Sequence, residues 1–293
     1  MKDSAKALLV LENGQIFEGK SIGATGVTLG EAVFTTGMNG YLETLTDPSY
    51  YGQIVTQTFP LIGNYGVIPK DFESSDVHVR GYIVRSMCEI PSNFRCQLDL
   101  DSFLMTKKII GLCDIDTRAL TKVLRETGVM NAIIVSGDSD EAKEIYAALE
   151  KPADKAKLLK KIRAYKITEA VESVTCSAVK IEESADVVFK ESAEYRFVPV
   201  RSDGTKVNDQ KEAMKDGKGK KVVLWDFGAK ANIRRELLKR GLSVTTVSGN
   251  ATAKEILDLA PDGIMLSNGP GDPKENTRII AAIKKLIKSG IPV

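Results

Sequence analysis

Residues 221–293 alternate short apolar runs with amphipathic stretches, and this alternation restricts the possible fold more than any other feature of the chain. The apolar runs fall at 222–225, 243–247 and 263–266, and each is followed by a stretch with helical periodicity. Strands that alternate with helices in this way form a parallel sheet with helices on both faces. Ligands bind such sheets outside the carboxyl ends of the strands. The pattern therefore predicts an α/β, doubly wound domain with a site at that edge.

The same pattern predicts that this domain is truncated. Residues 291–293 read as the beginning of a fourth strand, and the sequence ends there. An open parallel sheet that stops in mid-strand leaves an unpaired apolar edge. We therefore expect a domain whose C-terminal part is absent from this chain.

The preceding residues divide into two parts. Residues 1–150 have strand signals early and helix signals later, and Asn13-Gly14 between two apolar runs is typical of a hairpin. We predict a separate mixed α/β domain over 1–150. Residues 151–220 read as an extension with strand-like alternation at 173–181, followed by a highly charged stretch that predicts a linker.

Composition argues against several classes of function. The 293 residues carry 41 basic and 39 acidic side chains, a net charge of +2, whereas nucleic-acid-binding proteins usually have a marked basic excess. The N-terminal apolar run at 7–11 is too short for a signal peptide or a membrane span. We therefore predict a cytoplasmic protein whose partner is neither nucleic acid nor a membrane.

The strongest local signal is the loop 267–273, with the sequence Ser-Asn-Gly-Pro-Gly-Asp-Pro. Gly269 and Gly271 flank a proline and fix a sharp turn after the third predicted strand. Glycine lets the backbone approach a ligand closely, and backbone N–H groups in such a turn can bind a developing negative oxygen. The alternative is a tight strand-to-helix turn without a ligand.

Two further regions are rich in turn residues. The loop 225–230 after the first strand fits neither the dinucleotide fingerprint nor the P-loop, so dinucleotide binding is not predicted, and Asp226 could simply support the next helix. The loops 35–41 and 46–51 contain Gly, Pro and Asn between strands. Taken alone, they indicate only ordered loops.

The nucleophilic and metal-binding side chains form no recognisable pattern. The single histidine, His78, lies in an alternating apolar stretch, where an ordinary structural role is the simplest interpretation. The four cysteines match no C-x-x-C or zinc spacing and are expected to be reduced thiols. The residues alone predict neither a catalytic triad nor a metal site.

Together, the loops resemble one family, the small, glutamine-hydrolysing subunit of carbamoyl-phosphate synthetase. The glycine loop by itself is shared with other glutamine amidotransferases, and the region 151–220 resembles the family least. The similar stretches are 8–14, 30–66, 114–118, 225–235 and 267–273.

This resemblance implies a division of labour between two subunits. It implies an N-terminal domain followed by an incomplete flavodoxin-like, class I glutamine amidotransferase domain. In the family a cysteine, a histidine and a glutamate hydrolyse glutamine through a thioester. The released ammonia passes to a large subunit, which uses ATP and Mg to make carbamoyl phosphate for arginine and pyrimidine biosynthesis. The family therefore implies a heterodimer in the cytoplasm and no cofactor in this chain.

The resemblance also assigns site residues. Ser49, Gly269 and Gly271 match family residues that contact glutamine, and the nucleophile is expected just beyond Val293. No cysteine of this chain is in the nucleophile's place, and the histidine and glutamate of the machinery are missing too. We therefore predict that residues 1–293 by themselves are inactive, because removing a nucleophile costs several powers of ten in rate.

Two alternatives remain open at this point. The chain could be a non-catalytic module that only binds the large subunit through its N-terminal domain. It could also be another class I glutamine amidotransferase, serving anthranilate or purine synthesis. The region 1–150 argues against this second alternative, because those families do not carry that domain.

Overall fold

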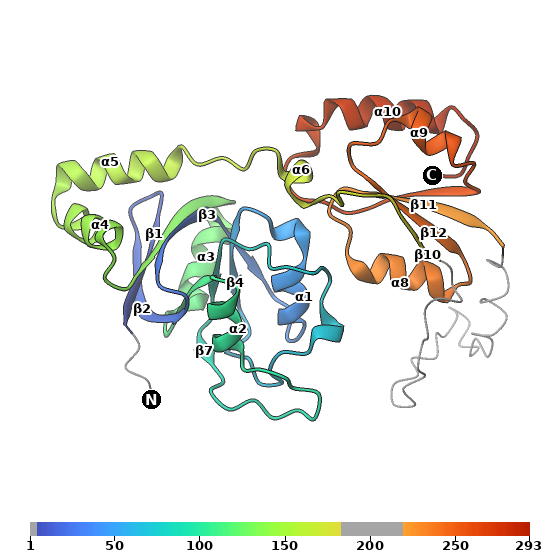
Figure 1. The fold of residues 1–293 in the computed structure, drawn as a ribbon. Helices are drawn as coiled ribbons and strands as arrows, with labels where there is room; N and C mark the ends of the chain where they lie inside the picture. The colour runs from blue at the N-terminus through green and yellow to red at the C-terminus, as the bar shows by residue number, and fades with distance from the viewer. Residues whose placement is uncertain (1–4, 183–218) are drawn as a thin grey trace. The chain divides into compact units, whose positions relative to one another are not determined.

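The computed structural model describes residues 5–182 and 219–293 (Figure 1). The chain separates into two compact units, Met1–Ala170 and Val171–Val293, and each is described here by itself. Most of the charged linker predicted before 221 lies outside the described residues. The boundaries predicted at 150 and 220 stay a prediction.

The first unit is built on a closed barrel of seven strands in the order β1-β2-β8-β6-β4-β3-β9. The hairpin predicted at Asn13-Gly14 is confirmed, since β1 pairs antiparallel with β2. The barrel closes because β1 also pairs with β9, far along the chain. The barrel strands are Lys6–Leu11 (β1), Ile16–Gly23 (β2), Gly26–Thr35 (β3), Gln53–Gln57 (β4), Gly81–Ile83 (β6), Ile110–Cys113 (β8) and Met130–Ser136 (β9).

Short helices and loops surround this barrel. The helix α3 shows how the sequence sets their limits. Asp116 caps its N-terminus, where the carboxylate accepts a hydrogen bond from the Ala119 N–H at 2.9 Å, and Gly128 caps its C-terminus. The remaining elements are Tyr41–Thr46 (α1), Pro48–Tyr50 (η1), Leu61–Ile62 (β5), Pro69–Asp71 (η2), Ser86–Met87 (β7), Leu100–Thr106 (α2), Thr117–Thr127 (α3), Asp140–Glu150 (α4) and Pro152–Arg163 (α5).

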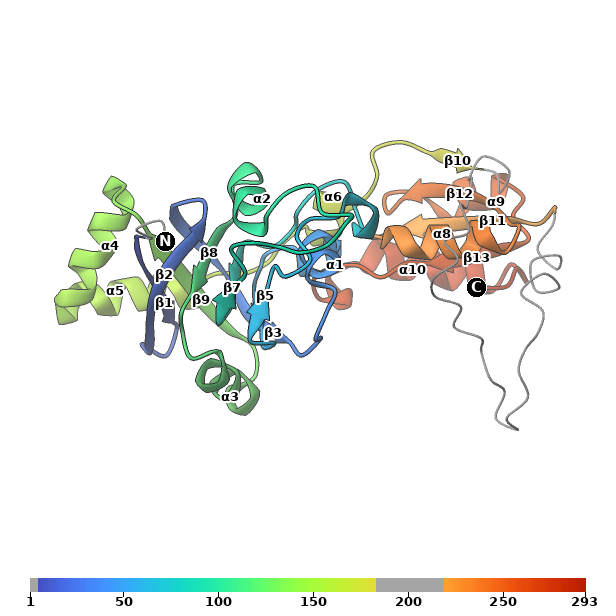
Figure 2. The same ribbon diagram turned by 90° about the horizontal axis from the view of Figure 1, so that it is seen from below.

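The second unit is a four-stranded sheet in the order β10-β12-β11-β13 (Figure 2). The predicted parallel pairing is confirmed for β11 with both β12 and β13. The first strand, β10, pairs antiparallel with β12. The strands are Lys180–Glu182 (β10), Lys221–Asp226 (β11), Ser243–Ser248 (β12) and Gly263–Leu266 (β13).

Helices cover both faces of this sheet (Figure 1). Leu238 of α8 packs with Leu224 and Val244 on one face, whereas α9 and α10 cover the other face with Ile256 and Leu286. The helices are Ala170–Val174 (α6), Ala231–Lys239 (α8), Ala253–Asp258 (α9) and Thr277–Ile287 (α10), with the single turn Pro273–Glu275 (η4) before α10.

Three local predictions differ from the structure. The strand-like alternation at 173–181 does not form one continuous strand, because α6 includes its first residues and only β10 at its end is a strand. His78 lies in an extended segment before β6, outside any strand. Residues 291–293 form no assigned strand, although the Ile264 N–H donates to the Pro292 carbonyl at 2.8 Å. Within 5–182 and 219–293, no helix combines the length and apolarity that crossing a membrane requires.

The core of the second unit generates a stability prediction. Ile256 of α9 is fully buried beside the single tryptophan, Trp225, whereas Ile287 at the end of α10 is 63% exposed. We expect Ile256→Ala to lower the free energy of unfolding by about 2–4 kcal/mol, because it leaves a cavity. The change at Ile287→Ala should stay below about 0.5 kcal/mol. Chemical denaturation followed by tryptophan fluorescence measures both, and equal losses would contradict the packing described.

Candidate functional site

The candidate site lies at the carboxyl ends of the parallel strands and is organised by Asp226, the last residue of β11. Its side chain is buried at 7% exposure. One carboxylate oxygen, Oδ1, accepts hydrogen bonds from the N–H groups of Gly228 at 2.8 Å and Ala229 at 2.6 Å. The other, Oδ2, accepts from the Cys176 N–H at 2.8 Å. A buried carboxylate is thus satisfied by backbone donors, and it fixes the turn into α8.

The glycine loop, residues 267–271, follows the neighbouring strand β13 and is tied to the turn after β11. The Ser267 hydroxyl accepts from the Phe227 N–H at 2.8 Å. The Asn268 side chain accepts from the Lys230 N–H at 3.1 Å and donates to the Gly228 carbonyl, also at 3.1 Å. The sequence predicted a turn here but gave no sign of these bonds between two loops about 40 residues apart.

The two glycines are required for different reasons. A Cβ on Gly269 would lie 2.4 Å from the Phe227 carbonyl oxygen, so only glycine fits against that turn. Gly271 has a φ of 79°, in the region that favours glycine. Both glycines are exposed and Pro270 between them is buried, so the outer edge of the loop is accessible to a ligand. The predicted contacts of Gly269 and Gly271 with glutamine stay a prediction.

Ser49 belongs to the first unit, apart in sequence from the glycine loop. It lies in η1, which is capped by Asp47, and the buried Asp47 carboxylate accepts from the Ser49 N–H at 2.9 Å. This bond orders the Asp-Pro-Ser loop that the sequence singled out. The structure therefore brings Gly269 and Gly271 into one loop and describes Ser49 in its own unit.

The four thiols are free and half-buried. Cys88, Cys96 and Cys113 belong to the first unit and Cys176 to the second. Burial raises the pKa of Cys176 to about 11, and the nearby Asp226 carboxylate adds to that rise. Burial likewise raises the pKa of Cys113 to about 11. Because the thiolate is the nucleophilic form, neither of these two cysteines is activated for attack at neutral pH.

His78 has local hydrogen-bonding partners in the first unit. Its ring atom Nε2 lies 3.0 Å from the Ser74 hydroxyl, and the backbone N–H of His78 donates to the Leu45 carbonyl at 3.2 Å. Burial lowers the pKa of the imidazole, and it outweighs the opposite influence of the Asp76 and Asp47 carboxylates. These contacts describe a structural histidine. Within the described residues, no group of three or more His, Cys, Asp and Glu side chains could hold a metal ion.

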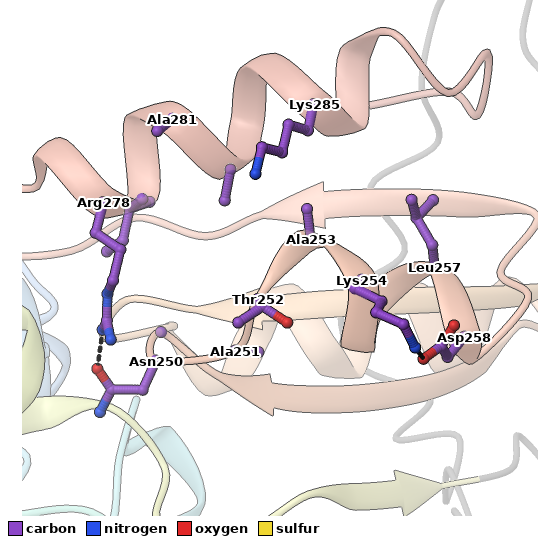
Figure 3. Close-up of a pocket in the computed structure, with 13 residues that line it drawn as sticks. Asn250, Ala251, Thr252, Ala253, Lys254, Leu257, Asp258, Arg278, Ala281 and Lys285 are labelled. Carbon is purple, nitrogen blue, oxygen red and sulfur yellow. Dashed lines mark hydrogen bonds and ion pairs between the residues drawn. The ribbon is translucent and has the colours of Figure 1, made fainter.

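A pocket of about 500 Å³ lies between α9 and α10, and it was not predicted from the sequence (Figure 3). None of its lining residues belongs to the glycine loop. Arg278 donates to the Asn250 side chain at one end, and Lys254 pairs with Asp258 at 2.6 Å. The pocket exists because several of the side chains that line it are small, among them Ala253, Ala281 and Ala282. We place the candidate site at the glycine loop, because its accessible backbone is held by a network of hydrogen bonds.

The close approach at Gly269 predicts a selective cost. Gly269→Ala should lower the free energy of unfolding by about 1–3 kcal/mol, because the new methyl group must displace the Phe227 turn. Gly263→Ala is the matched control in β13, since the nearest atom to its added Cβ is 3.8 Å away. Denaturation of both variants, followed by tryptophan fluorescence, measures the difference. Similar stabilities for the two would show that the turn yields without strain.

The single histidine allows a direct titration. The ring resonances of His78 in NMR spectra should titrate below the ordinary value of 6.5, because burial lowers the pKa. A depressed folded-state pKa contributes stability that is fully present above the unfolded value and is lost as the pH falls through the folded one. Unfolding measured between pH 7 and pH 5 should therefore show falling stability, and the same titration in denaturant supplies the reference. A midpoint at or above the reference would refute this account.

Comparison with known proteins agrees with the two-part organisation of the chain. Residues 9–134 match the family model "Carbamoyl-phosphate synthase small chain, CPSase domain". Residues 223–293 match the model "Glutamine amidotransferase class-I". A solved aminopeptidase from Aneurinibacillus sp. strain AM-1 has a TM-score of 0.28 at 13% identity, over 46% of this chain and 31% of that one, too low to support an argument.

Whole-chain similarity is much stronger. The chain is 43% identical to the carbamoyl phosphate synthase small chain of Clostridium perfringens, over 96% of this chain and 67% of that protein. It is 42% identical to that of Vibrio vulnificus, over 99% of this chain and 70% of that protein, and 41% identical to that of Salmonella typhimurium, over 98% and 68%. It thus spans about two thirds of the length of these relatives. The chain therefore belongs to the carbamoyl-phosphate synthase small chain family.

Proposed function

We propose that this chain acts in glutamine-dependent carbamoyl phosphate synthesis, as the subunit that binds glutamine and from which ammonia passes to a large chain. The observation that carries this proposal is the glycine loop at the end of β13, with exposed Gly269 and Gly271 held against the turn after β11. Family membership over nearly the whole chain supports the same conclusion.

The proposed chemistry uses this loop as a binding element. In the family, a cysteine thiolate attacks the glutamine carboxamide, ammonia leaves, and a thioester remains to be hydrolysed. A backbone N–H of the glycine loop stabilises the oxyanion that forms during attack. Gly269 and Gly271 hold the glutamine, and Ser49 of the first unit contributes a further contact. In this proposal the second unit is part of a doubly wound, flavodoxin-like class I amidotransferase domain.

We further propose that residues 1–293 by themselves bind glutamine without hydrolysing it. The second unit contains one cysteine, Cys176, whose pKa is raised to about 11. The chain has a single histidine, and it lies at position 78 in the first unit. An attacking thiolate with an imidazole base is therefore not provided within 171–293.

The proposed partner is the large chain of the same enzyme, and the proposed site of action is the cytoplasm. The large chain uses ATP and Mg to convert ammonia and bicarbonate to carbamoyl phosphate for arginine and pyrimidine biosynthesis. The match over residues 9–134 favours this partner over those of other class I glutamine amidotransferases. The role of a non-catalytic module that binds the large chain is the second candidate, because the match over 9–134 is independent of the amidotransferase domain.

Two measurements on purified residues 1–293 test the proposal. Ammonia release from L-glutamine should stay at the level of a protein-free blank, with or without the cognate large chain. Calorimetric titration with L-glutamine should show binding that Gly269→Ala weakens by at least tenfold, because the shifted turn moves the binding amides. Gly263→Ala serves as the control and should bind like the parent chain.

The outcomes separate the parts of the proposal. Ammonia above the blank would overturn the inactivity of residues 1–293. Binding of the large chain without binding of L-glutamine would favour the non-catalytic module. A chain that binds neither the large chain nor L-glutamine would contradict the proposed function as a whole. L-Asparagine, one methylene shorter, controls for nonspecific binding of amino acids.

A further inference from the structure

We infer that Thr175 and Asp226 are positioning residues, which fix the glycine loop of the proposed glutamine site through the turn after β11. The inference rests on the proposed function for the identity of the ligand, and on hydrogen bonds within the second unit for the coupling. It assigns a role at the site to the segment 171–176, which lies far from the glycine loop in the sequence.

The Thr175 hydroxyl joins the carboxyl ends of two neighbouring strands. It donates to the Asp226 carbonyl at 2.6 Å and accepts from the Gly249 N–H at 2.7 Å. Asp226 ends β11, and Gly249 directly follows β12. One hydroxyl thus satisfies one backbone group at each strand end. The side chain of Val171 packs in the same core and anchors the segment.

Gly249 shows how closely these parts approach. A Cβ added there would lie 2.9 Å from Cγ1 of Val171 and 3.0 Å from the Asp226 carbonyl oxygen. The segment 171–176 is therefore seated against the strand ends without room for a side chain between them. A displacement of this segment would be transmitted directly to Asp226.

Asp226 extends the connection to the site. Its Oδ2 accepts from the Cys176 N–H, while its Oδ1 accepts from the N–H groups of Gly228 and Ala229. The two oxygens of one buried carboxylate thus hold the segment 171–176 on one side and the turn into α8 on the other. Because charge-assisted hydrogen bonds are stronger than neutral ones, this residue is the rigid link of the network.

The last step runs from the turn to the glycine loop. The Asn268 side chain donates to the Gly228 carbonyl and accepts from the Lys230 N–H, and the Ser267 hydroxyl accepts from the Phe227 N–H. The Phe227 carbonyl also abuts Gly269. These contacts are made with backbone groups of residues 227–230. A change in that turn therefore moves Gly269, which the proposed function places in contact with glutamine.

Amide hydrogen exchange in the intact 293-residue chain tests this coupling. Thr175→Val keeps the shape of the side chain and removes the hydroxyl, and Thr175→Ser restores the hydroxyl. We expect about tenfold faster exchange at Gly249 in Thr175→Val, from loss of the direct bond, and at least threefold faster exchange at Phe227 and Lys230. Thr175→Ser should exchange like the parent chain.

A second variant separates the two sides of the carboxylate. Asp226→Asn can keep its carbonyl oxygen on the Gly228 and Ala229 amides, and it then places an NH₂ group against the Cys176 N–H. We expect faster exchange at Cys176, Phe227 and Lys230. Thr246→Val is the matched control, because the buried Thr246 hydroxyl has no hydrogen-bond partner within the described part of the chain. It should leave exchange at all these positions unchanged.

The pattern of exchange decides the inference. Faster exchange confined to Gly249, with Phe227 and Lys230 unchanged, would overturn it. Equal acceleration throughout β11 and β13 would also overturn it, because it would indicate general destabilisation. Titration with L-glutamine, followed at the Gly269 and Gly271 amide resonances of the parent chain, tests the proposed function separately. If these resonances do not respond while the exchange pattern is as expected, the proposed binding of glutamine is refuted, and the positioning role of Thr175 and Asp226 still holds.

Discussion

The arrangement of the second unit depends on a buried carboxylate that must be satisfied by backbone hydrogens. Asp226 cannot remain charged and buried without donors, and three N–H groups from two separate segments provide them. This requirement determines where the turn into α8 lies. The position of the turn then determines where Asn268 and Gly269 can lie. The need to satisfy this one buried side chain thus influences the position of the glycine loop, which follows about 40 residues later in the sequence.

The parts of the fold that could be predicted are those set by local pattern. The runs at 222–225 and 243–247 are apolar because β11 and β12 pack against helices on both faces, whereas Met265 in the run 263–266 is 38% exposed. The helices between the runs require parallel pairing. The hairpin at Asn13-Gly14 follows from turn chemistry alone. These features need only neighbouring residues, so one sequence is sufficient to identify them.

The parts that were missed depend on contacts between distant residues. Closure of the barrel requires β1 to pair with β9, and no periodicity within either strand specifies that partner. The edge strand β10 has three residues, too few for a period, and it exists because β12 offers a free edge. At the site, composition identified Gly269 and Gly271 as turn residues. The closeness of Phe227 that requires glycine at 269 could be found only in three dimensions.

A site made of backbone amides differs from one made of side chains in how it can be held. A catalytic side chain is oriented by its own rotamer and its neighbours, whereas an amide has no freedom apart from that of the main chain. Its direction must therefore be set by fixing the loop on both sides. Ser267 and Asn268 do this before the first glycine, and Asp272 does it after the second, where its carboxylate accepts from the Lys274 N–H at 2.9 Å. The residues that bind no ligand are consequently those that determine how well the loop could bind one.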